Sequence, residues 1–172
     1  MWNKLLNSID RVAGLFGLVA MGLLAALIGS MIYEVAARYV FDAPTLWAFD
    51  ISYMLNGSLF LIGSAYALKA DAHVRIDFLS TALPVRVQQL WNAFIYLLVL
   101  VPIFAIFSYV AIGKAYKAYI TNEVEMVSPW APYVWPFFAA GALGIALLAL
   151  QLFAEGNRFF LGQKQPGQTE DT

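Results

Sequence analysis

Four long stretches of the chain contain no charged residue and no histidine. They are residues 12–33, 51–68, 87–113 and 126–154, which hold 22, 18, 27 and 29 residues. A helix needs about 20 residues, at about 1.5 Å each, to cross a hydrocarbon core of about 30 Å. Because the stretches fill more than half of the 172 residues, the pattern predicts an all-α integral membrane protein with four transmembrane helices. The remainder is short loops and tails, with no room for a soluble domain.

Prolines and charges between these stretches set the expected ends of the helices. The expected spans are about 12–41, 45–68, 85–119 and 133–155. Pro44 and Pro84 favour boundaries because a residue before proline avoids the α conformation. Pro102 lies inside the third span, where it removes one backbone hydrogen bond and predicts a kink. We expect residues 1–161 to form one membrane domain and residues 162–172 to form a polar cytoplasmic tail.

The basic residues predict the orientation of the spans. Seven Lys and Arg lie in the N-terminal segment, the loop between the second and third spans, and the C-terminal tail, against three in the other two loops. The positive-inside rule then places both termini in the cytoplasm. Lys4 and Arg11 before an apolar run resemble the start of a secretory signal, but the run is long for one and no convincing cleavage site follows. We expect a retained first helix.

The loop between the second and third spans carries its own pattern. Ile76, Leu79 and Leu83 fall at i, i+3 and i+7, which predicts a short amphipathic helix in the cytoplasmic membrane interface. The alternation in residues 74–77 also fits a strand, and this alternative stays open.

The composition offers no catalytic or cofactor chemistry. Cysteine is absent and His73 is the single histidine, which excludes zinc clusters, Fe–S ligation, disulfides and a bis-histidine haem within one chain. A net charge of −1 gives no basic surface for nucleic acid. Neither a phosphate-binding loop nor a nucleophile–base arrangement occurs. We therefore expect no enzyme activity and no cofactor, with the lipid bilayer as a partner.

Two charged clusters interrupt the apolar stretches. The first contains Glu34, Arg38, Asp42 and Asp50, around the turn between the first and second spans, with Trp47 at interface depth. Charges near membrane depth need partners or water. The cluster favours a structural clamp or a contact with another subunit over an ion pathway.

The second cluster is His73, Arg75 and Asp77. A lone histidine beside an arginine makes no metal site, and a proton relay needs further titratable groups at membrane depth. A face for solvent or lipid headgroups and a contact with another subunit are equal alternatives.

Polar and small residues within the spans favour helix packing over transport. The candidates for hydrogen bonds between helices are Asn56, Ser58, Ser64 and Asn92, and those for close packing are Gly14, Gly17, Gly22, Ala25 and Ala26. The paired broken helices of a transporter core are missing from the sequence. We do not expect this chain to transport a solute alone.

Residues 34–79 resemble a known family. The matching positions are Glu34-x-x-x-Arg38-Tyr39-Val40-Phe41, Pro44, Trp47, Asp50, Gly63 and the segment 70–77. They are similar to the small membrane subunit, of the DctQ type, of tripartite ATP-independent periplasmic (TRAP) transporters. The number of spans and the length resemble that family over essentially the whole chain. Asp50 stands alone where the family usually has two acidic residues after the tryptophan.

The resemblance implies a non-catalytic permease subunit of a three-part importer in the bacterial inner membrane. Such a subunit packs on the static scaffold of a large elevator-type membrane subunit and enlarges it. The large subunit uses a sodium gradient to take up a carboxylate or related anionic solute, which a periplasmic binding protein delivers in a transient contact. The alternatives are a scaffold or anchor subunit of another membrane complex and an autonomous small transporter.

On this interpretation, both charged clusters are candidate partner contacts. They comprise Glu34, Arg38, Trp47 and Asp50 at the periplasmic turn and His73, Arg75 and Asp77 at the cytoplasmic side.

Overall fold

The structure is a computed structural model that describes residues 2–72 and 84–164. Its elements are α1 (Trp2–Val40), α2 (Ala48–Lys69), α3 (Val85–Phe94), η2 (Ile95–Leu100), α4 (Val101–Ile120) and α5 (Trp135–Phe160). Because α3, η2 and α4 run on without a break, the described residues contain four helices long and apolar enough to cross a membrane. The predicted all-α class with four spans is confirmed. The predicted interfacial helix falls mostly on residues 73–83, outside the described residues.

The first helix is longer than the sequence pattern indicated. It begins at Trp2, ten residues before the expected start, and has 39 residues. At about 1.5 Å per residue it is about 58 Å long, nearly twice the thickness of a hydrocarbon core. The polar residues near its two ends can therefore lie close to the two membrane surfaces while its apolar middle crosses the lipid.

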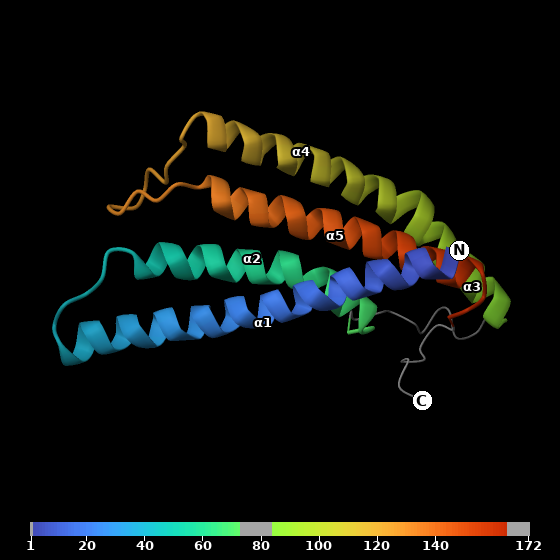
Figure 1. Ribbon diagram of the computed structural model, residues 1–172, viewed down its shortest axis with the longest axis horizontal. Helices are drawn as coiled ribbons and strands as arrows, with labels where there is room; N and C mark the ends of the chain where they lie inside the picture. The colour runs from blue at the N-terminus through green and yellow to red at the C-terminus, as the bar shows by residue number, and fades with distance from the viewer. Residues whose placement is uncertain (1, 73–83, 165–172) are drawn as a thin grey trace.

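The four spans lie side by side in a row (Figure 1). Their order is α4, α5, α2 and α1, so α5 and α2 occupy the middle, and α1 makes no contact with α4 in the described chain. At the end that holds the N-terminus, α1 crosses α5 (Figure 1). The result is an open layer rather than a closed four-helix bundle, and each helix exposes much of its apolar surface.

The centre of the layer is a close crossing of α2 and α5. A Cβ atom on Gly144 would lie 2.5 Å from the carbonyl carbon of Leu61, and one on Gly57 would lie 2.6 Å from the ring of Phe137. Small residues allow helix backbones to approach in this way. The neighbour of Gly144 is main chain, which cannot rotate away, so this contact fixes how near the two helices lie.

The small residues of α1 contribute less to packing than expected. Gly17 lies against the ring of Tyr66, where a Cβ atom would come within 2.7 Å. Gly22 faces open space, and Ala25 and Ala26 are exposed. The expectation of close packing was therefore wrong for these last three residues, because they face away from α2.

The polar residues expected to join helices also differ from the structure. The Ser64 hydroxyl donates to the carbonyl of Leu61 within its own helix at 2.7 Å, and Asn56 is exposed. A contact between helices is made instead by the hydroxyls of Ser30 in α1 and Ser52 in α2, which lie 3.3 Å apart.

The third span changes its winding before Pro102. The six residues of η2 form a π-helical stretch, and proline removes a donor from the ladder just after it. Gly156 of α5 lies against this stretch, where a Cβ atom would come within 2.8 Å of the Leu97 side chain. A π-helical stretch that faces a glycine therefore precedes Pro102, where the sequence predicted a kink.

Replacing Gly144 by alanine is expected to destabilise the protein. The added methyl group meets the main chain of Leu61 and forces α2 and α5 apart, and such overpacking costs about 1–3 kcal/mol. Gly113→Ala is the matched control, because nothing lies within 4 Å of a Cβ atom there. Thermal unfolding in detergent, followed by circular dichroism, should show a lower midpoint for Gly144→Ala alone. Equal midpoints for the two variants would contradict the close crossing.

Candidate functional site

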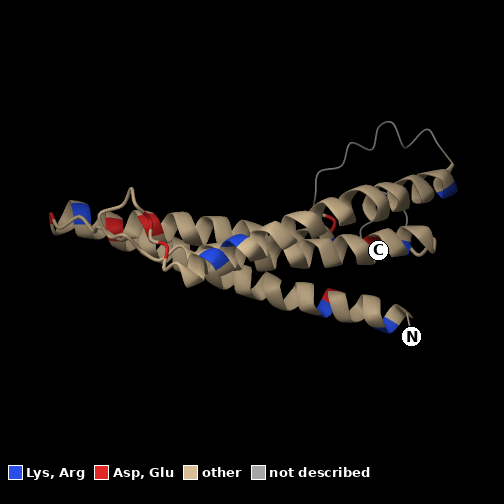
Figure 2. Cartoon of the chain, turned by 90° about the horizontal axis from the view of Figure 1, so that it is seen from above, with Lys and Arg blue, Asp and Glu red and all other residues tan. Residues whose placement is uncertain are grey.

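Charged residues lie mostly toward the two ends of the layer (Figure 2). We call the end formed by residues 33–50 and 121–134 the turn end. We call the end formed by residues 2–14, 69–72 and 151–164 the terminal end.

At the turn end, Glu34 joins α1 to the chain that leads into α2. Its Oε1 accepts a hydrogen bond from Nε of Arg38 at 2.9 Å. Its Oε2 accepts from the backbone N–H of Thr45 at 3.0 Å and also from the Thr45 hydroxyl. The side chain of Glu34 is 16% exposed, against 55% for Arg38. Both carboxylate oxygens of Glu34 therefore accept hydrogen bonds within the chain, while the guanidinium of Arg38 faces outward.

Trp47 supports the same turn by stacking on Tyr33 of α1. The ring centroids are 5.6 Å apart and the planes differ by 28°. The carboxylate of Asp42, by contrast, makes no hydrogen bond or ion pair within the described chain, and Asp42 is exposed. Of the predicted cluster, the Trp47 side chain thus supports the turn, whereas the Asp42 side chain does not.

Asp50 contacts a segment that the sequence did not connect to it. It is 5% exposed, and its Oδ2 accepts a hydrogen bond from the hydroxyl of Ser128 in the α4–α5 loop. The Ser128 oxygen in turn accepts from the backbone N–H of Trp130 at 3.2 Å. Asp50 therefore ties α2 to this loop rather than pairing with Arg38, so the predicted four-charge cluster divides into two separate contacts.

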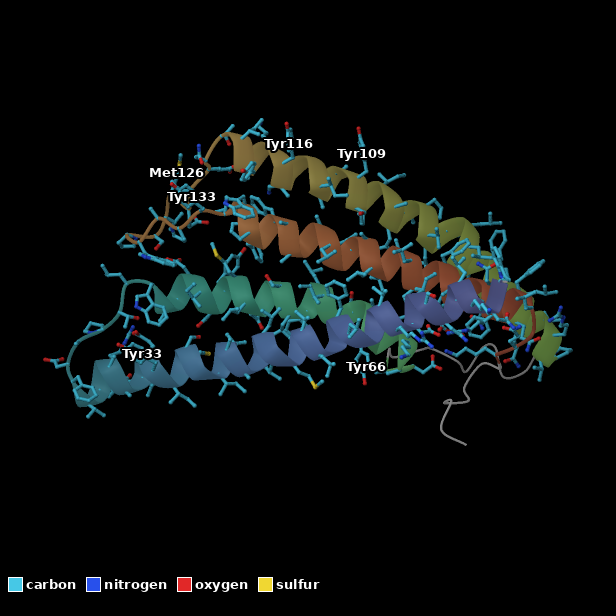
Figure 3. All side chains as sticks on the ribbon, viewed as in Figure 1. Tyr33, Tyr66, Tyr109, Tyr116, Met126 and Tyr133 are labelled. Carbon is cyan, nitrogen blue, oxygen red and sulfur yellow. The ribbon has the colours of Figure 1, made fainter. Side chains whose placement is uncertain are left out.

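The α4–α5 loop forms a hairpin-like projection. The backbone N–H of Glu125 donates to the carbonyl of Pro132 at 2.9 Å, and Val124 pairs with Tyr133 in an isolated bridge. Met126 and Val127 at its tip are 91% and 92% exposed, and Figure 3 shows Met126 at the margin of the molecule. The turn end therefore combines a charged surface at Arg38 with an apolar loop tip.

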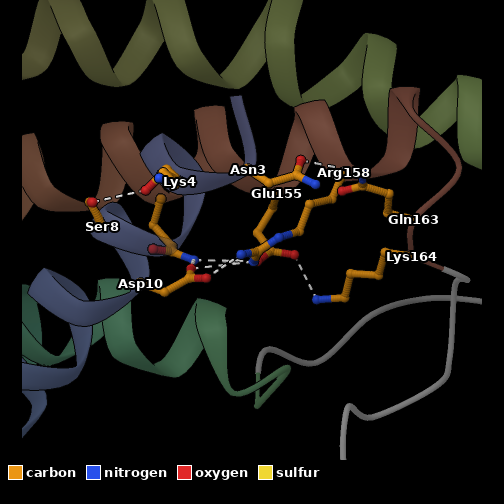
Figure 4. A network of polar contacts seen from close by, with 9 residues as sticks. Asn3, Lys4, Ser8, Asp10, Glu155, Arg158, Gln163 and Lys164 are labelled. Atoms are coloured by element: carbon orange, nitrogen blue, oxygen red, sulfur yellow. Dashed lines mark hydrogen bonds and ion pairs between the residues drawn. The ribbon is translucent and has the colours of Figure 1, made fainter. Parts of the chain in front are cut away.

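The terminal end holds a network of buried charges (Figure 4). Arg158 of α5 donates to Glu155 Oε1 at 2.8 Å and to both oxygens of Asp10 in α1. Gln151 also donates to Asp10, at 3.0 Å. Glu155 is 1% exposed. A buried carboxylate is tolerated only when it is paired, and Arg158 pairs with both acids between α1 and α5.

Lys164 extends the network beyond the end of α5. Its ammonium group binds Glu155 Oε2 at 2.6 Å and Asp71 Oδ2, just after α2, at 2.7 Å. The backbone carbonyl of Lys164 accepts from Nε2 of Gln89 in α3 at 3.0 Å. The network therefore joins segments from α1, α2, α3 and α5 at one place.

The sequence pattern did not predict this network. Arg158 and Lys164 contributed only to the predicted orientation, and Asp10 and Glu155 belonged to neither predicted cluster. A usable signal was present, because residues 151, 155 and 158 follow helical spacing at the end of an apolar stretch. Asp10 is far away in sequence, and that signal could not have named it.

The second predicted cluster, His73, Arg75 and Asp77, lies outside the described residues. Asp71 shortly before it is held at the terminal end by Lys164. In the described part of the chain, no group of three or more His, Asp or Glu side chains could hold a metal ion.

Comparison with known proteins places these features in a family. Residues 27–160 match the family described as tripartite ATP-independent periplasmic transporters, DctQ component. Over 82 residues the chain is 33% identical to the sialic acid TRAP transporter permease protein SiaT of Haemophilus influenzae (strain 86-028NP), which covers 48% of this chain and 13% of that protein.

A second relative is the sialic acid TRAP transporter small permease protein SiaQ of Vibrio cholerae serotype O1. The two chains are 29% identical over 88 residues, which is 51% of this chain and 47% of that protein. The match therefore spans less than half the length of either relative.

Replacing Arg158 by methionine is expected to destabilise the isolated protein. The change removes the guanidinium from Asp10 and from Glu155, which is 1% exposed, and removing one member of a buried pair costs about 3–5 kcal/mol. Arg38→Met makes the same chemical change at a side chain that is 55% exposed, and it should barely alter stability. Thermal unfolding in detergent should separate the two variants. If Arg158→Met melts like Arg38→Met, the network contributes nothing to stability.

Proposed function

Because this chain belongs to the DctQ family of TRAP transporter components, we propose that it is the small permease subunit of a TRAP-type importer in the bacterial inner membrane. The chain is a multi-pass membrane protein of a transporter family rather than an enzyme. Its share of transport is to support the membrane machinery.

The open layer of helices is the observation that carries this proposal. A path for a solute through one chain requires helices that surround it, and α1 does not meet α4 in the described structure. Large apolar side chains instead point away from the layer, including Leu18 on α1, which is 62% exposed, and Tyr109 on α4, which is 80% exposed. Surfaces of this kind suit lipid and a second membrane subunit.

The partner in this proposal is a large elevator-type membrane subunit driven by sodium. The small subunit packs on its static scaffold and enlarges the platform past which the mobile part moves. A periplasmic binding protein delivers the solute in a transient contact. The solute is a carboxylate or a related anion, a class that includes the sialic acid for which both relatives are named. Both termini lie in the cytoplasm on the positive-inside rule.

The turn end is the proposed periplasmic contact. Arg38 presents its charge outward, whereas Glu34 holds the guanidinium in place and Trp47 stiffens the turn on Tyr33. Asp50 fixes the neighbouring loop through Ser128. In this arrangement Arg38 touches the partner and the other residues position it. His73, Arg75 and Asp77 form the proposed contact on the cytoplasmic side.

Reversing the charge of Arg38 is expected to weaken assembly. Arg38→Glu removes the outward positive charge and sets a second carboxylate beside Glu34, which repels it. Lys117→Glu is the matched control, because it reverses an exposed charge on α4 toward the same end. The measurements are copurification with the coexpressed large subunit, solute uptake by whole cells, and thermal stability of the isolated chain.

We expect Arg38→Glu to lower copurification and uptake several-fold, with little change in the stability of the isolated chain. Unchanged copurification together with unchanged uptake would sink the assignment of Arg38 to the interface.

The cytoplasmic contact can be tested by crosslinking. The chain has no cysteine, so Asp77→Cys carries a single thiol for a short photoactivatable maleimide reagent. We expect a product with the large subunit in membranes that contain the complex. Membranes that contain Asp77→Cys and an unrelated multi-pass protein in place of the large subunit show the background of chance crosslinks. A thiol at residue 77 that reaches lipid alone, and never the large subunit, would count against this contact.

A further inference from the structure

An apolar groove lies between α1 and α2. It encloses about 400 Å³. Where the two helices are close, the lining residues are Gly17, Ala20 and Gly63. A Cβ atom on Gly63 would lie 3.4 Å from that of Ala20. Larger side chains, among them Leu24 and Phe60, line the rest. Neither polar network described above reaches into this groove.

The length of the groove matches one leaflet of a membrane. Its lining on α1 runs as far as Leu24, and Lys69 lies over Gly14 near the other end. Ten residues separate Gly14 from Leu24, which is about 15 Å along a helix. This distance is about half of a hydrocarbon core of about 30 Å. A chain of lipid that begins at Lys69 would therefore end near the middle of the membrane.

Lys69 supplies a positive charge at the mouth of the groove. Its Nζ lies 3.6 Å from where a Cβ atom on Gly14 would be, so its aliphatic stem crosses toward α1. Within the described chain the ammonium group has no hydrogen bond or ion pair. Asp10 is near enough to attract it, but the oxygens of Asp10 already accept from Arg158 and Gln151. The three N–H donors of Lys69 remain available for an outside acceptor.

Tyr66 completes the mouth of the groove. Its ring lies against Gly17, the residue is 44% exposed, and Figure 3 shows its side chain directed away from the layer. A tyrosine with an apolar ring and a polar hydroxyl is suited to the boundary between lipid tails and headgroups. The mouth therefore presents a cation and a phenol at headgroup level above an apolar channel.

We propose that this groove binds one anionic phospholipid from the leaflet at the terminal end. The phosphate accepts from Lys69, and one acyl chain lies along the groove toward Leu24. Basic groups between transmembrane helices recognise anionic headgroups by this chemistry. A partner helix, which is about 10–12 Å wide with its side chains, fits a groove confined to one leaflet less well than an acyl chain does. This site requires no other subunit, so it stands apart from the proposed function.

Native mass spectrometry of the purified full-length chain tests the site. The probes are dioleoylphosphatidylglycerol and dioleoylphosphatidylcholine, added to the protein in dodecyl maltoside. We expect the native chain to retain the anionic lipid in preference to the zwitterionic one. Lys69→Gln should lower retention of the anionic lipid about five-fold, the size expected for one lysine at an anionic headgroup. Lys4→Gln removes the same charge at the same end and should leave retention unchanged.

A second pair of variants tests the acyl channel. Ala67→Trp places a large side chain in the groove and should lower retention of both lipids, whereas Ala105→Trp on the exposed face of α4 should not. Circular dichroism checks that both variants keep their helices. Lys69→Gln leaves the helix packing intact, so its result decides the headgroup contact even where Ala67→Trp lowers the yield.

Three results would overturn the proposal. One is anionic lipid retention by Lys69→Gln equal to that of Lys4→Gln. Another is unchanged retention of both lipids by a folded Ala67→Trp. The third is a crosslink from Met21→Cys, at the edge of the groove, to a helix of the large subunit in the assembled complex, since it would assign the groove to a protein.

Discussion

The backbone contact between α2 and α5 at Gly144 governs the architecture. Because main chain packs against main chain at the centre, α2 and α5 form a closely packed pair. α1 and α4 then pack on opposite sides of this pair and do not meet. Without a hydrophobic driving force inside lipid, such close packing is what holds helices together. An open layer with two broad apolar faces follows, and the proposed supporting role rests on this shape.

Polar contacts at the two ends hold this layer in place. At the turn end Glu34 and Asp50 each hold one loop through hydrogen bonds. At the terminal end Arg158 and Lys164 bind three carboxylates from three segments. Buried charges are costly, so the chain places them only where each meets a partner. The middle of the layer is left for apolar packing and for contact with lipid.

The residues that carry the family resemblance mainly build the turn. Glu34, Trp47 and Asp50 all bind or stack within the chain, whereas Arg38 faces outward. Three of these motif residues thus hold the turn in place, and the proposed partner contact is left to Arg38. This distinction was not visible in the sequence, where all four residues looked equivalent.

The sequence by itself determined the spans and the local pairs. Runs without charge must be helices in lipid, because every backbone group needs an internal partner there, and Glu34 and Arg38 meet because they are one helical turn apart. Only the tertiary structure decided the order of the helices, the Asp50–Ser128 contact and the Asp10–Arg158 pair, whose members are 78 and 148 residues apart. The physical reason is that a helix that is apolar on nearly every side has no sequence pattern to show which face packs on which neighbour. The close approach of backbones at glycine, and the partners of buried charges, settle that choice only once the chain has folded.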